Sequence, residues 1–558
     1  MIKLFSVGFW ETIARLILRN RILIIVALLL ATYLLSTQWE KMRFTYTEAN
    51  LLPDKHPVNI EYNRFIDTFG EEGNLIVIGI KDSSLFSVDN FNAWNRFSES
   101  FADFEAVETV ISLNKIQKLV KNQKLQKFDM ESIVPDSINS LQELNDLRYN
   151  LKTSYPFYDK FLYNSDSETV RTAIYLKKEI VNTPKRKDFI LNEFKQTVNA
   201  FEKETGLDVR ISGMPYIRTL NSQLIISEIG KFISVALLVT SLIFFFFFRS
   251  FRATFISVVV VIIGVMWTFG ILGAFEYEIT VLTALIPPVI IVIGIPNCIF
   301  LINKYQHEVR KHGNMAKSLQ RVITKIGNAT LMTNVTTASG FAAFIFTKST
   351  LLQEFGTVAS LSILAIFMLC LLIIPIIYSF MPMPKDKHLK HLNKRWINGF
   401  VDWMEHVVKH RKITIYVTSL ILLVASIIGI YQIRISGSLI EDMPKKAEFF
   451  KDIRFFEQEY DGIMPLEFMI DTKRKKGVMK LATLKRMNQL EEEISEIDEL
   501  SRPMSIVSLV KYSKQAYYNG NPKYYQIPTA QENSFILSYA KKSSSEVDLL
   551  RNFVDSTG

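Results

Sequence analysis

The feature that most constrains this chain is a series of seven apolar runs separated by basic or polar segments. A helix needs about 20 mostly apolar residues to cross the hydrocarbon core of a bilayer. Six runs meet this requirement, and a seventh, near residues 329–347, is less apolar and rich in Thr and Ser. We count the seventh because the basic loops fall on one side of a membrane only if it spans. The predicted spans lie near residues 22–38, 230–248, 253–275, 280–302, 329–347, 355–381 and 413–432.

The composition agrees with a membrane protein and argues against other classes. Of the 558 residues, 49% are hydrophobic, and the formal net charge is +10. Lys and Arg crowd the short segments between apolar runs, so topology explains much of the charge and we expect no nucleic-acid partner. The two cysteines, Cys298 and Cys370, both lie inside apolar runs. Disulfide scaffolds and zinc sites need more cysteines at closer spacing, so we expect buried thiols, no metal and no cofactor.

The basic residues predict an orientation for the spans. Four sets fall on one side if every run crosses, and loops rich in Lys and Arg stay in the cytoplasm. The long segments 39–229 and 433–558 are then extracytoplasmic, whereas the N-terminus and the linker 382–412 are cytoplasmic. The four sets are Arg15, Arg19 and Arg21; Arg249 and Arg252; Lys304, Arg310, Lys311, Lys317, Arg321 and Lys325; and Lys385, Lys387, Lys390, Lys394, Arg395, Lys409, Arg411 and Lys412.

Two cytoplasmic segments have the pattern of amphipathic surface helices. Residues 1–21 are expected to form an interfacial helix before the first span. A cleaved signal peptide is the alternative for that span, but no obvious small-residue cleavage site follows it. The segment 303–328 is interpreted as a basic amphipathic helix bound to anionic lipid. The apolar face of the first helix would carry Phe5, Phe9, Trp10, Ile13, Leu16 and Ile17.

An internal repeat is visible at an offset near 390 residues. Arg19-Asn20-Arg21 before the first span matches Lys409-His410-Arg411 before the seventh. One repeat unit is a span, a large outer domain and five spans. The second unit stops inside its outer domain, so we expect this chain to be a piece of a longer protein. Weaker matches pair Leu52-Pro53 with Met443-Pro444, Phe65 and Phe69 with Phe456 and Tyr460, Leu75–Ile80 with the region of Leu466–Ile470, and Val110–Leu113 with Ile506–Leu509.

The first outer segment, 39–229, mixes strand and helix patterns. This alternation predicts an α+β domain with βαβ units in a ferredoxin-like arrangement. His56 is isolated, the carboxylates are scattered among lysines, and neither Gly-x-Ser-x-Gly nor His-Glu-x-x-His occurs, so we do not expect an enzyme. Strands are predicted at 75–80, 107–113, 169–181 and 207–213, and helices at 91–104, 114–150 and 186–204.

Several motifs resemble those of resistance–nodulation–division (RND) transporters. One span, an α/β outer domain and five spans, followed by a repeat of the same, is the plan of that superfamily. The likeness covers nearly the whole chain and is strongest to the MMPL-like and sterol-sensing-domain branch, with 230–381 as the five-span unit. The matching motifs are Ile211–Pro215, Phe248–Arg252, Gly294–Asn297 with Phe300–Tyr305, and Thr336–Phe341.

The resemblance implies a multi-pass inner-membrane transporter with porter-like outer domains. Similar proteins move lipids, hopanoid-like or sterol-like molecules, or other amphiphiles, and many use the proton gradient. The implied partners are membrane lipids and a hydrophobic substrate, and a dimer-like or trimeric self-association fits the family. The leading hypothesis is an exporter of lipids or other hydrophobic molecules. The alternatives are a non-pumping sterol-sensing-like protein that binds lipid and controls a partner, and an accessory protein for secretion.

The candidate site follows from a departure from this family. Proton-coupled relatives place an acid in the fourth span just after the signature glycine, because a costly intramembrane carboxylate serves proton relay. Here Pro296 and Asn297 hold those positions, and no Asp or Glu lies in the first six spans as drawn above. The transport or coupling site is expected among Gly294, Pro296, Asn297, Asn303, Thr333, Asn334, Thr336 and Thr337.

Three interpretations of Asn297 are open. Coupling resides in the second repeat unit, or another ion binds neutral ligands that include Asn297, or the fold is uncoupled and senses lipid. Pro296 removes a helix hydrogen bond and favours a kink, and broken helices often flank transport sites. The polar residues between the fourth and fifth spans can equally be packing contacts, because small and polar side chains help membrane helices to associate.

Overall fold

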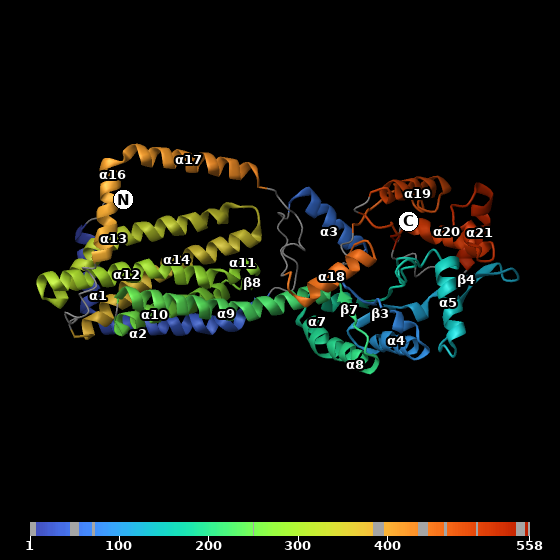
Figure 1. Ribbon diagram of the computed structural model, residues 1–558, viewed down its shortest axis with the longest axis horizontal. Helices are drawn as coiled ribbons and strands as arrows, with labels where there is room; N and C mark the ends of the chain where they lie inside the picture. Colours follow the sequence, from blue (N-terminus) through green and yellow to red (C-terminus); the bar gives the residue numbers. More distant parts are fainter. Residues whose placement is uncertain are drawn as a thin grey trace. The chain divides into compact units, whose positions relative to one another are not determined.

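The computed structural model describes residues 7–44, 55–69, 73–248, 250–382, 395–433, 445–462, 466–497, 500–542 and 553–555. The chain divides into two compact units (Figure 1). A helical unit comprises Met1–Pro53 with Ser222–Ser438, and an α/β unit comprises Asp54–Asn221 with Leu439–Gly558. Some residues used above lie outside the described ranges, namely Phe5, Leu52, Pro53, Arg249, Lys385, Lys387, Lys390, Lys394, Met443 and Pro444.

Seven helices in the described part of the chain are long and apolar enough to cross a membrane. The prediction of a multi-pass α-helical membrane protein is therefore confirmed at this level, whereas the side that each loop faces stays a prediction. The segment near 329–347 belongs to one of these helices in spite of its Thr and Ser content. The helices are α2 (Arg21–Thr37), α9 (Met214–Phe248), α10 (Phe251–Ala274), α12 (Ile286–His312), α13 (Met315–Ala342), α14 (Thr350–Phe380) and α17 (Lys412–Tyr431).

The core of the helical unit forms where α10, α12, α13 and α14 pack together. Small residues allow this close approach, as is usual between membrane helices. A Cβ on Gly264 of α10 would lie 2.4 Å from the Cδ1 of Ile366 on α14. A Cβ on Gly294 of α12 would lie 3.1 Å from Val261 and 3.3 Å from Ile366. These glycines therefore set the spacing of α10, α12 and α14 near the middle of the bundle.

Helix α1 (Val7–Arg19) lies against the bundle through its apolar face. Trp10, Ala14 and Ile17 are buried with residues of α13 and α14, and the Trp10 ring occupies the space that a Cβ on Gly327 would need. The amphipathic pattern thus predicted the helix, but part of its apolar face packs on protein. Leu16 remains exposed. The shorter elements are η1 (Gln38–Lys41), α11 (Val281–Ala284), η6 (Ala343–Phe346), α16 (Arg395–His410), and the parallel pair β1 (Arg43–Phe44) and β8 (Glu278–Ile279).

The sequence pattern suggested that the segment 303–328 is one surface helix, and this prediction was wrong. The segment is the end of α12 and the start of α13, separated at Gly313. Gly313 adopts a left-handed conformation with φ of 60°, and its N–H donates to the carbonyl of Val309 at 2.8 Å. Asn314 then caps α13 by accepting from the N–H of Lys317 at 3.0 Å. A glycine after the last turn and an asparagine before the first are the usual signals for such a break.

The α/β unit is built on a four-stranded antiparallel sheet with the order β3-β6-β2-β7. The elements of this sheet follow a β-α-β-β-α-β path through β2, α4, β3, β6, α8 and β7, with a hairpin and a helix inserted between β3 and β6. Aromatic residues join the two helices, because Phe97 of α4 stacks on Phe201 of α8 at 4.3 Å between ring centres. The bounds are β2 (Leu75–Ile80), η2 (Ser83–Phe86), α4 (Val88–Ser100), η3 (Phe101–Asp103), β3 (Val107–Ile111), η4 (Leu113–Lys115), β6 (Val170–Leu176), α6 (Lys178–Val181), α7 (Pro184–Asp188), the π-helix η5 (Phe189–Phe194), α8 (Lys195–Thr205) and β7 (Arg210–Ser212).

One helical prediction in this unit was wrong over most of its length, and two repeat matches pair segments of different secondary structure. The stretch 114–150, expected to be helical, forms the hairpin of β4 (Gln117–Asn122) and β5 (Lys127–Ser132), followed by α5 (Leu141–Ser154). Leu466–Ile470 is not a strand, and these side chains have no described partner strand. The region that resembled Val110–Leu113 begins a helix. The remaining elements are α3 (Pro57–Phe69), α18 (Glu448–Glu459), α19 (Leu481–Ser495), α20 (Ile506–Tyr517), η8 (Pro522–Tyr524) and α21 (Ala530–Lys542).

Candidate functional site

Two of the candidate residues meet in a buried contact between α12 and α13. The Asn297 side chain donates to the Oδ1 of Asn334 at 3.0 Å, and Asn334 donates back to the Oδ1 of Asn297 at 2.9 Å. The Asn334 amide also donates to the carbonyl of Thr330, one turn earlier on α13, at 2.7 Å. Asn297 is 5% exposed and Asn334 is 2% exposed. Each amide therefore satisfies the other where solvent does not reach.

The packing around α12 fixes the position of this amide pair. Gly294, one turn before Asn297, brings α12 close to α10 and α14. Cys298, the next residue along, is fully buried, and its Sγ lies 3.6 Å from the Sγ of Cys370 on α14. Both cysteines are free thiols, as the sequence led us to expect. The part of α12 that carries Asn297 therefore packs closely against α10 and α14, and the Asn297 side chain contacts Asn334 of α13.

The chemistry of the amide pair is that of a neutral link. A carboxamide both donates and accepts hydrogen bonds but does not titrate near neutral pH. The pair can hold α12 and α13 together, or exchange partners if these helices separate, but it cannot take up and release a proton. Polar contacts between membrane helices contribute about 0.6 to 2 kcal/mol. A link of that strength can be broken and remade during a conformational cycle.

The other candidate residues do not join this pair. Thr333 and Thr336 are exposed on α13, and each hydroxyl donates to the carbonyl four residues earlier in its own helix, as does that of Thr337. Asn303 is half-buried about 9 Å further along α12, taking 1.5 Å per residue. Helix α12 continues through Pro296, which is exposed. Thr333 and Thr336 were grouped with Asn334 by type, whereas the helical period places them away from its face of α13.

A second cluster on the same two helices was not foreseen. Glu308, near the end of α12, is 2% exposed, and its carboxylate is surrounded by basic side chains. The Nζ of Lys325 on α13 lies 3.2 Å away and the Nε2 of His312 lies 3.4 Å away. Arg321 is 3.7 Å and Lys304 is 3.8 Å from the same group. The spacing of Lys304, Glu308 and His312 at four-residue intervals was the available signal.

Three carboxylates on the membrane helices were not predicted as candidate residues, because these helices extend beyond the spans that were drawn from apolar runs. Glu228 lies on α9, Glu308 on α12 and Glu354 on α14, each outside the predicted apolar core. A helix continues past its hydrocarbon-crossing part wherever its backbone bonds and side-chain packing allow. Position 297 therefore has no acid, but other carboxylates lie near the ends of these helices.

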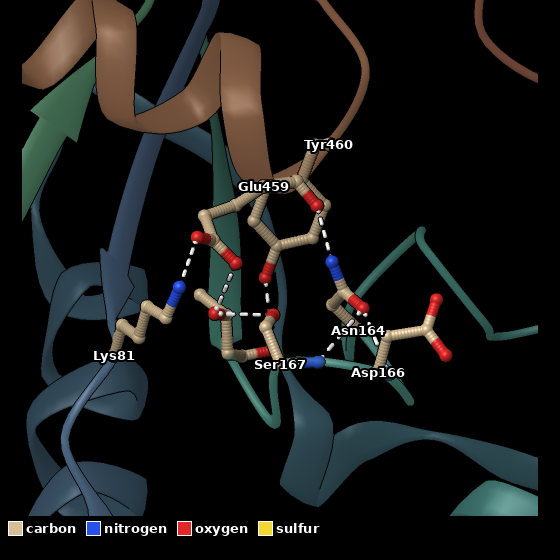
Figure 2. Close-up of polar contacts among 7 residues, drawn as sticks. Lys81, Asn164, Asp166, Ser167, Glu459 and Tyr460 are labelled. Atoms are coloured by element: carbon tan, nitrogen blue, oxygen red, sulfur yellow. Dashed lines mark hydrogen bonds and ion pairs between the residues drawn. The ribbon is translucent and has the colours of Figure 1, made fainter.

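In the α/β unit, α18 docks on the sheet of the first segment (Figure 2). The Glu459 carboxylate lies 2.5 Å from the Nζ of Lys81 and accepts from the hydroxyl of Thr169 at 2.8 Å. Asn164 donates to the backbone carbonyl of Glu459, and the Tyr460 hydroxyl donates to the carbonyl of Thr169 at 3.0 Å. Phe456 packs with Val77 of β2 in the same contact. Residues more than 280 positions apart in the sequence therefore meet here.

Two carboxylates in this contact differ in their electrostatics. Burial raises the pKa of Asp452 to about 6, although Arg210 lies 3.1 Å away and the N–H of Ile211 also donates to it. Burial also acts to raise the pKa of Glu459, but its bonds to Lys81 and to neighbouring hydroxyls outweigh this and lower the pKa overall. Asp452 is thus the group in this contact that changes charge closest to neutral pH.

The titratable residues do not gather into a metal-binding group. Among the described residues, no three His, Cys, Asp or Glu side chains lie close enough to hold a metal ion. The polar features available for function are therefore the amide pair, the Glu308 cluster and the docking of α18.

The chain is similar to a protein that is named as a membrane protein, and a family model matches it. It is 24% identical over 264 residues to a protein of Methanocaldococcus jannaschii that is named as a membrane protein. The aligned region covers 47% of this chain and 65% of that protein, which is less than two thirds of its length. A family model described as the MMPL family matches residues 91–408, more than half of the 558 residues. The protein therefore belongs to the MMPL family.

Proposed function

We propose that this protein is a membrane transporter that exports lipids or other hydrophobic molecules. The observation that carries the proposal is the buried Asn297–Asn334 pair within an apolar bundle. Polar groups are costly inside a membrane and are kept there for a purpose, such as a substrate or ion pathway. The family membership supports a transporter or a related protein. In this proposal α12 and α13 change their contact during the cycle, and the amide pair is the link that opens.

The nature of the pair bears on the energy source. An amide pair cannot relay protons, so we propose that no proton passes through Asn297. Both Oδ1 atoms already accept a hydrogen bond from the partner amide, which disfavours their use as ligands for another ion in this conformation. The contact would then respond to helix movement and would not drive it.

The charge distribution supports an inner-membrane protein with a cytoplasmic N-terminus. Lys304, Arg310 and Lys311 lie at the end of α12, and Arg19 and Arg21 lie where α1 meets α2. Basic loops of this kind remain in the cytoplasm. The α/β unit then lies outside the cytoplasm. Its sheet and the docking of α18 support a porter-like role, in which the unit receives substrate that leaves the membrane.

The test uses the full-length protein in proteoliposomes that carry a pH gradient and a fluorescent phospholipid. We expect the wild type to move the lipid and no proton flux to depend on Asn297. Asn297→Asp places a titratable group against Asn334 and should add proton flux or pH dependence. Asn303→Asp is the matched control, because it makes the same chemical change on α12 away from the amide pair. Failure of the wild type to move any lipid or amphiphile, in either direction, contradicts the transporter proposal.

A second candidate function is lipid binding without transport, in which the protein regulates a partner. The absence of a titratable group from the amide pair favours it, because a sensor needs no relay. Lipid that binds to the wild type but never crosses the liposome membrane would support this function over export.

A further inference from the structure

A pocket opens between α1 and the start of α13. Its volume is about 460 Å³. This size falls within the range of about 300 to 1,000 Å³ that is typical of small-ligand sites. The lining comes from two helices that are far apart in the sequence but packed together. The lining residues are Arg15, Leu18 and Arg19 of α1, the cap residue Asn314, and Ala316, Lys317 and Gln320 of α13.

The charge of the pocket is strongly positive. Arg15, Arg19 and Lys317 all line it, and no acidic residue does. Arg15 has a solvent-exposed ion pair with Glu11 at 3.7 Å. Within the described part of the chain, the side chains of Arg19 and Lys317 have no acidic partner. The first turn of α13 adds the positive end of its helix dipole, which favours an anion.

The buried carboxylate near the end of α12 does not neutralise the pocket. Glu308 already pairs with Lys304, Arg321 and Lys325, and these three cations exceed the charge of one carboxylate. The surroundings of the pocket therefore add positive charge to that of its lining.

The pocket lies at the boundary between membrane helices and their connecting turns. Helix α2 begins at Arg21, two residues after Arg19, and α12 ends at His312, two residues before Asn314. Lipid phosphates occupy this level of a bilayer, just beyond the hydrocarbon core. Leu18 and Ala316 give the lining an apolar part, and Leu16 remains exposed on α1. The combination suits an amphiphile with an anionic head.

The two walls of the pocket are held in place by packing. The Trp10 ring lies over Gly327 of α13, and Ala14 and Ile17 are buried in the same cluster. Because α1 cannot shift along α13 without disturbing this contact, Arg15 and Arg19 are kept opposite Lys317. Such preorganisation lowers the cost of binding a ligand.

We propose that this pocket binds the phosphate group of an anionic membrane lipid, with Arg19 and Lys317 as the cations that recognise it. The site is distinct from the Asn297–Asn334 pair and does not depend on lipid export. A lipid headgroup and a dissolved phosphate compound share the chemistry that the pocket recognises, so the test separates them.

The test counts lipids bound to the full-length protein by native mass spectrometry in a mild detergent. Phosphatidylglycerol is titrated against phosphatidylcholine. Arg19→Gln/Lys317→Gln removes two cations from the pocket, and we expect about 25-fold weaker binding of phosphatidylglycerol, at about fivefold per cation near a membrane surface. Arg310→Gln/Lys311→Gln is the control, because it removes the same charge from the end of α12 without touching the pocket lining.

Equal weakening in both double variants would mean diffuse attraction and would overturn the proposal. The lipid assignment would also be overturned if millimolar inorganic phosphate displaced phosphatidylglycerol from the wild type, because the occupant would then be a dissolved phosphate. If the double variant fails to fold, Lys317→Gln alone and the charge-conserving Arg19→Lys/Lys317→Arg take its place. The first should weaken binding about fivefold and the second should retain it.

Discussion

Asn297 and Asn334 form a contact in which each side chain depends on the other. Once the pair is buried, neither amide can replace its partner with water, because no water is available for hydrogen bonds in a membrane core. The contact is therefore asymmetric in its energetics. Losing one partner costs more than losing both, since the remaining amide keeps its desolvation cost.

We predict that Asn334→Leu lowers the free energy of unfolding by about 1 to 3 kcal/mol, because it leaves the Asn297 amide unpaired. The double variant Asn297→Leu/Asn334→Leu should lose less than the sum of the two single variants, with a coupling of about 0.6 to 1.7 kcal/mol. Denaturant unfolding of the protein in detergent micelles measures all four states of the cycle. Strict additivity would show that the amides do not interact.

Asp452 predicts how the docking of α18 responds to pH. Its pKa is about 6 in the folded protein, against an ordinary value of 3.8 in an unfolded chain. The folded state therefore binds more protons between about pH 4 and pH 6. The stabilisation is fully present below pH 3.8 and is lost as the pH rises through 6, by about 3 kcal/mol at most.

Replacing this carboxyl should remove the pH response. We expect Asp452→Asn to show a flatter dependence of unfolding temperature on pH between 4 and 6 than the wild type. The side chain still accepts hydrogen bonds from Arg210 and Ile211. Asp461→Asn is the control, because Asp461 is more exposed and pairs with Lys160 in the same region. An unchanged slope in Asp452→Asn would show that burial does not raise this pKa.

At the residue scale, the sequence predicted which residues are notable better than it predicted their contact partners. Asn297 was singled out because it replaces an acid, and the structure pairs it with Asn334, which was also a candidate. Thr333 and Thr336 of α13 were grouped with Asn334 by residue type, although the helical period separates them from the face that carries Asn334. Glu308 was missed since its helix is longer than the apolar run that located it.

Helix α18 is the element whose position depends most on distant parts of the chain. It packs on β2 and β7 through Phe456, Tyr460 and Asp452. Phe456 lies against Gly79, where a Cβ would be 3.1 Å from the ring. The missing side chain at Gly79 therefore provides the space in which the ring sits.

We predict that Gly79→Val loosens α18, because the added side chain overlaps the Phe456 ring and the carbonyl of Val170. Overpacking of this kind costs about 1 to 3 kcal/mol. Tryptic cleavage at Lys451 and Arg454 should become faster, since cleavage requires local opening of the helix. Gly79→Val/Phe456→Leu should be less affected than the sum of its single changes. Unchanged cleavage in Gly79→Val would mean that α18 does not rely on this contact.

The elements that sequence reasoning predicted well are those with a strong local signal. The membrane helices have long apolar runs, and β2 and β6 are short runs rich in β-branched residues. The β4–β5 hairpin was taken for helix, because the polar stretch around Lys121 to Lys127 has no clear period of two. Gly313 and Asn314 are signals for a helix break within 303–328. The prediction of one helix rested on the basic charge pattern instead.

At the scale of the whole molecule, the proposed orientation places the β4–β5 hairpin outside the cytoplasm and the end of α12 inside it. We predict that a membrane-impermeant maleimide added to intact cells labels Lys124→Cys, at the tip of the β4–β5 hairpin, and does not label Lys311→Cys until the cells are permeabilised. The background is Cys298→Ala/Cys370→Ala, whose native thiols are buried. Labelling in the opposite order would reverse the proposed orientation, and with it the direction of export.

The docking of α18 also has a consequence for the order of events during synthesis. Lys81 and Glu459 are 378 residues apart. A ribosome adds about 5 to 20 residues per second, so the face of β2 around Val77 and Gly79 waits about 20 to 75 seconds for its covering helix. Several membrane helices must be inserted during that interval. The α/β unit therefore stays incomplete during most of its synthesis. A chaperone that protects the unit during this time would bind the uncovered face of β2.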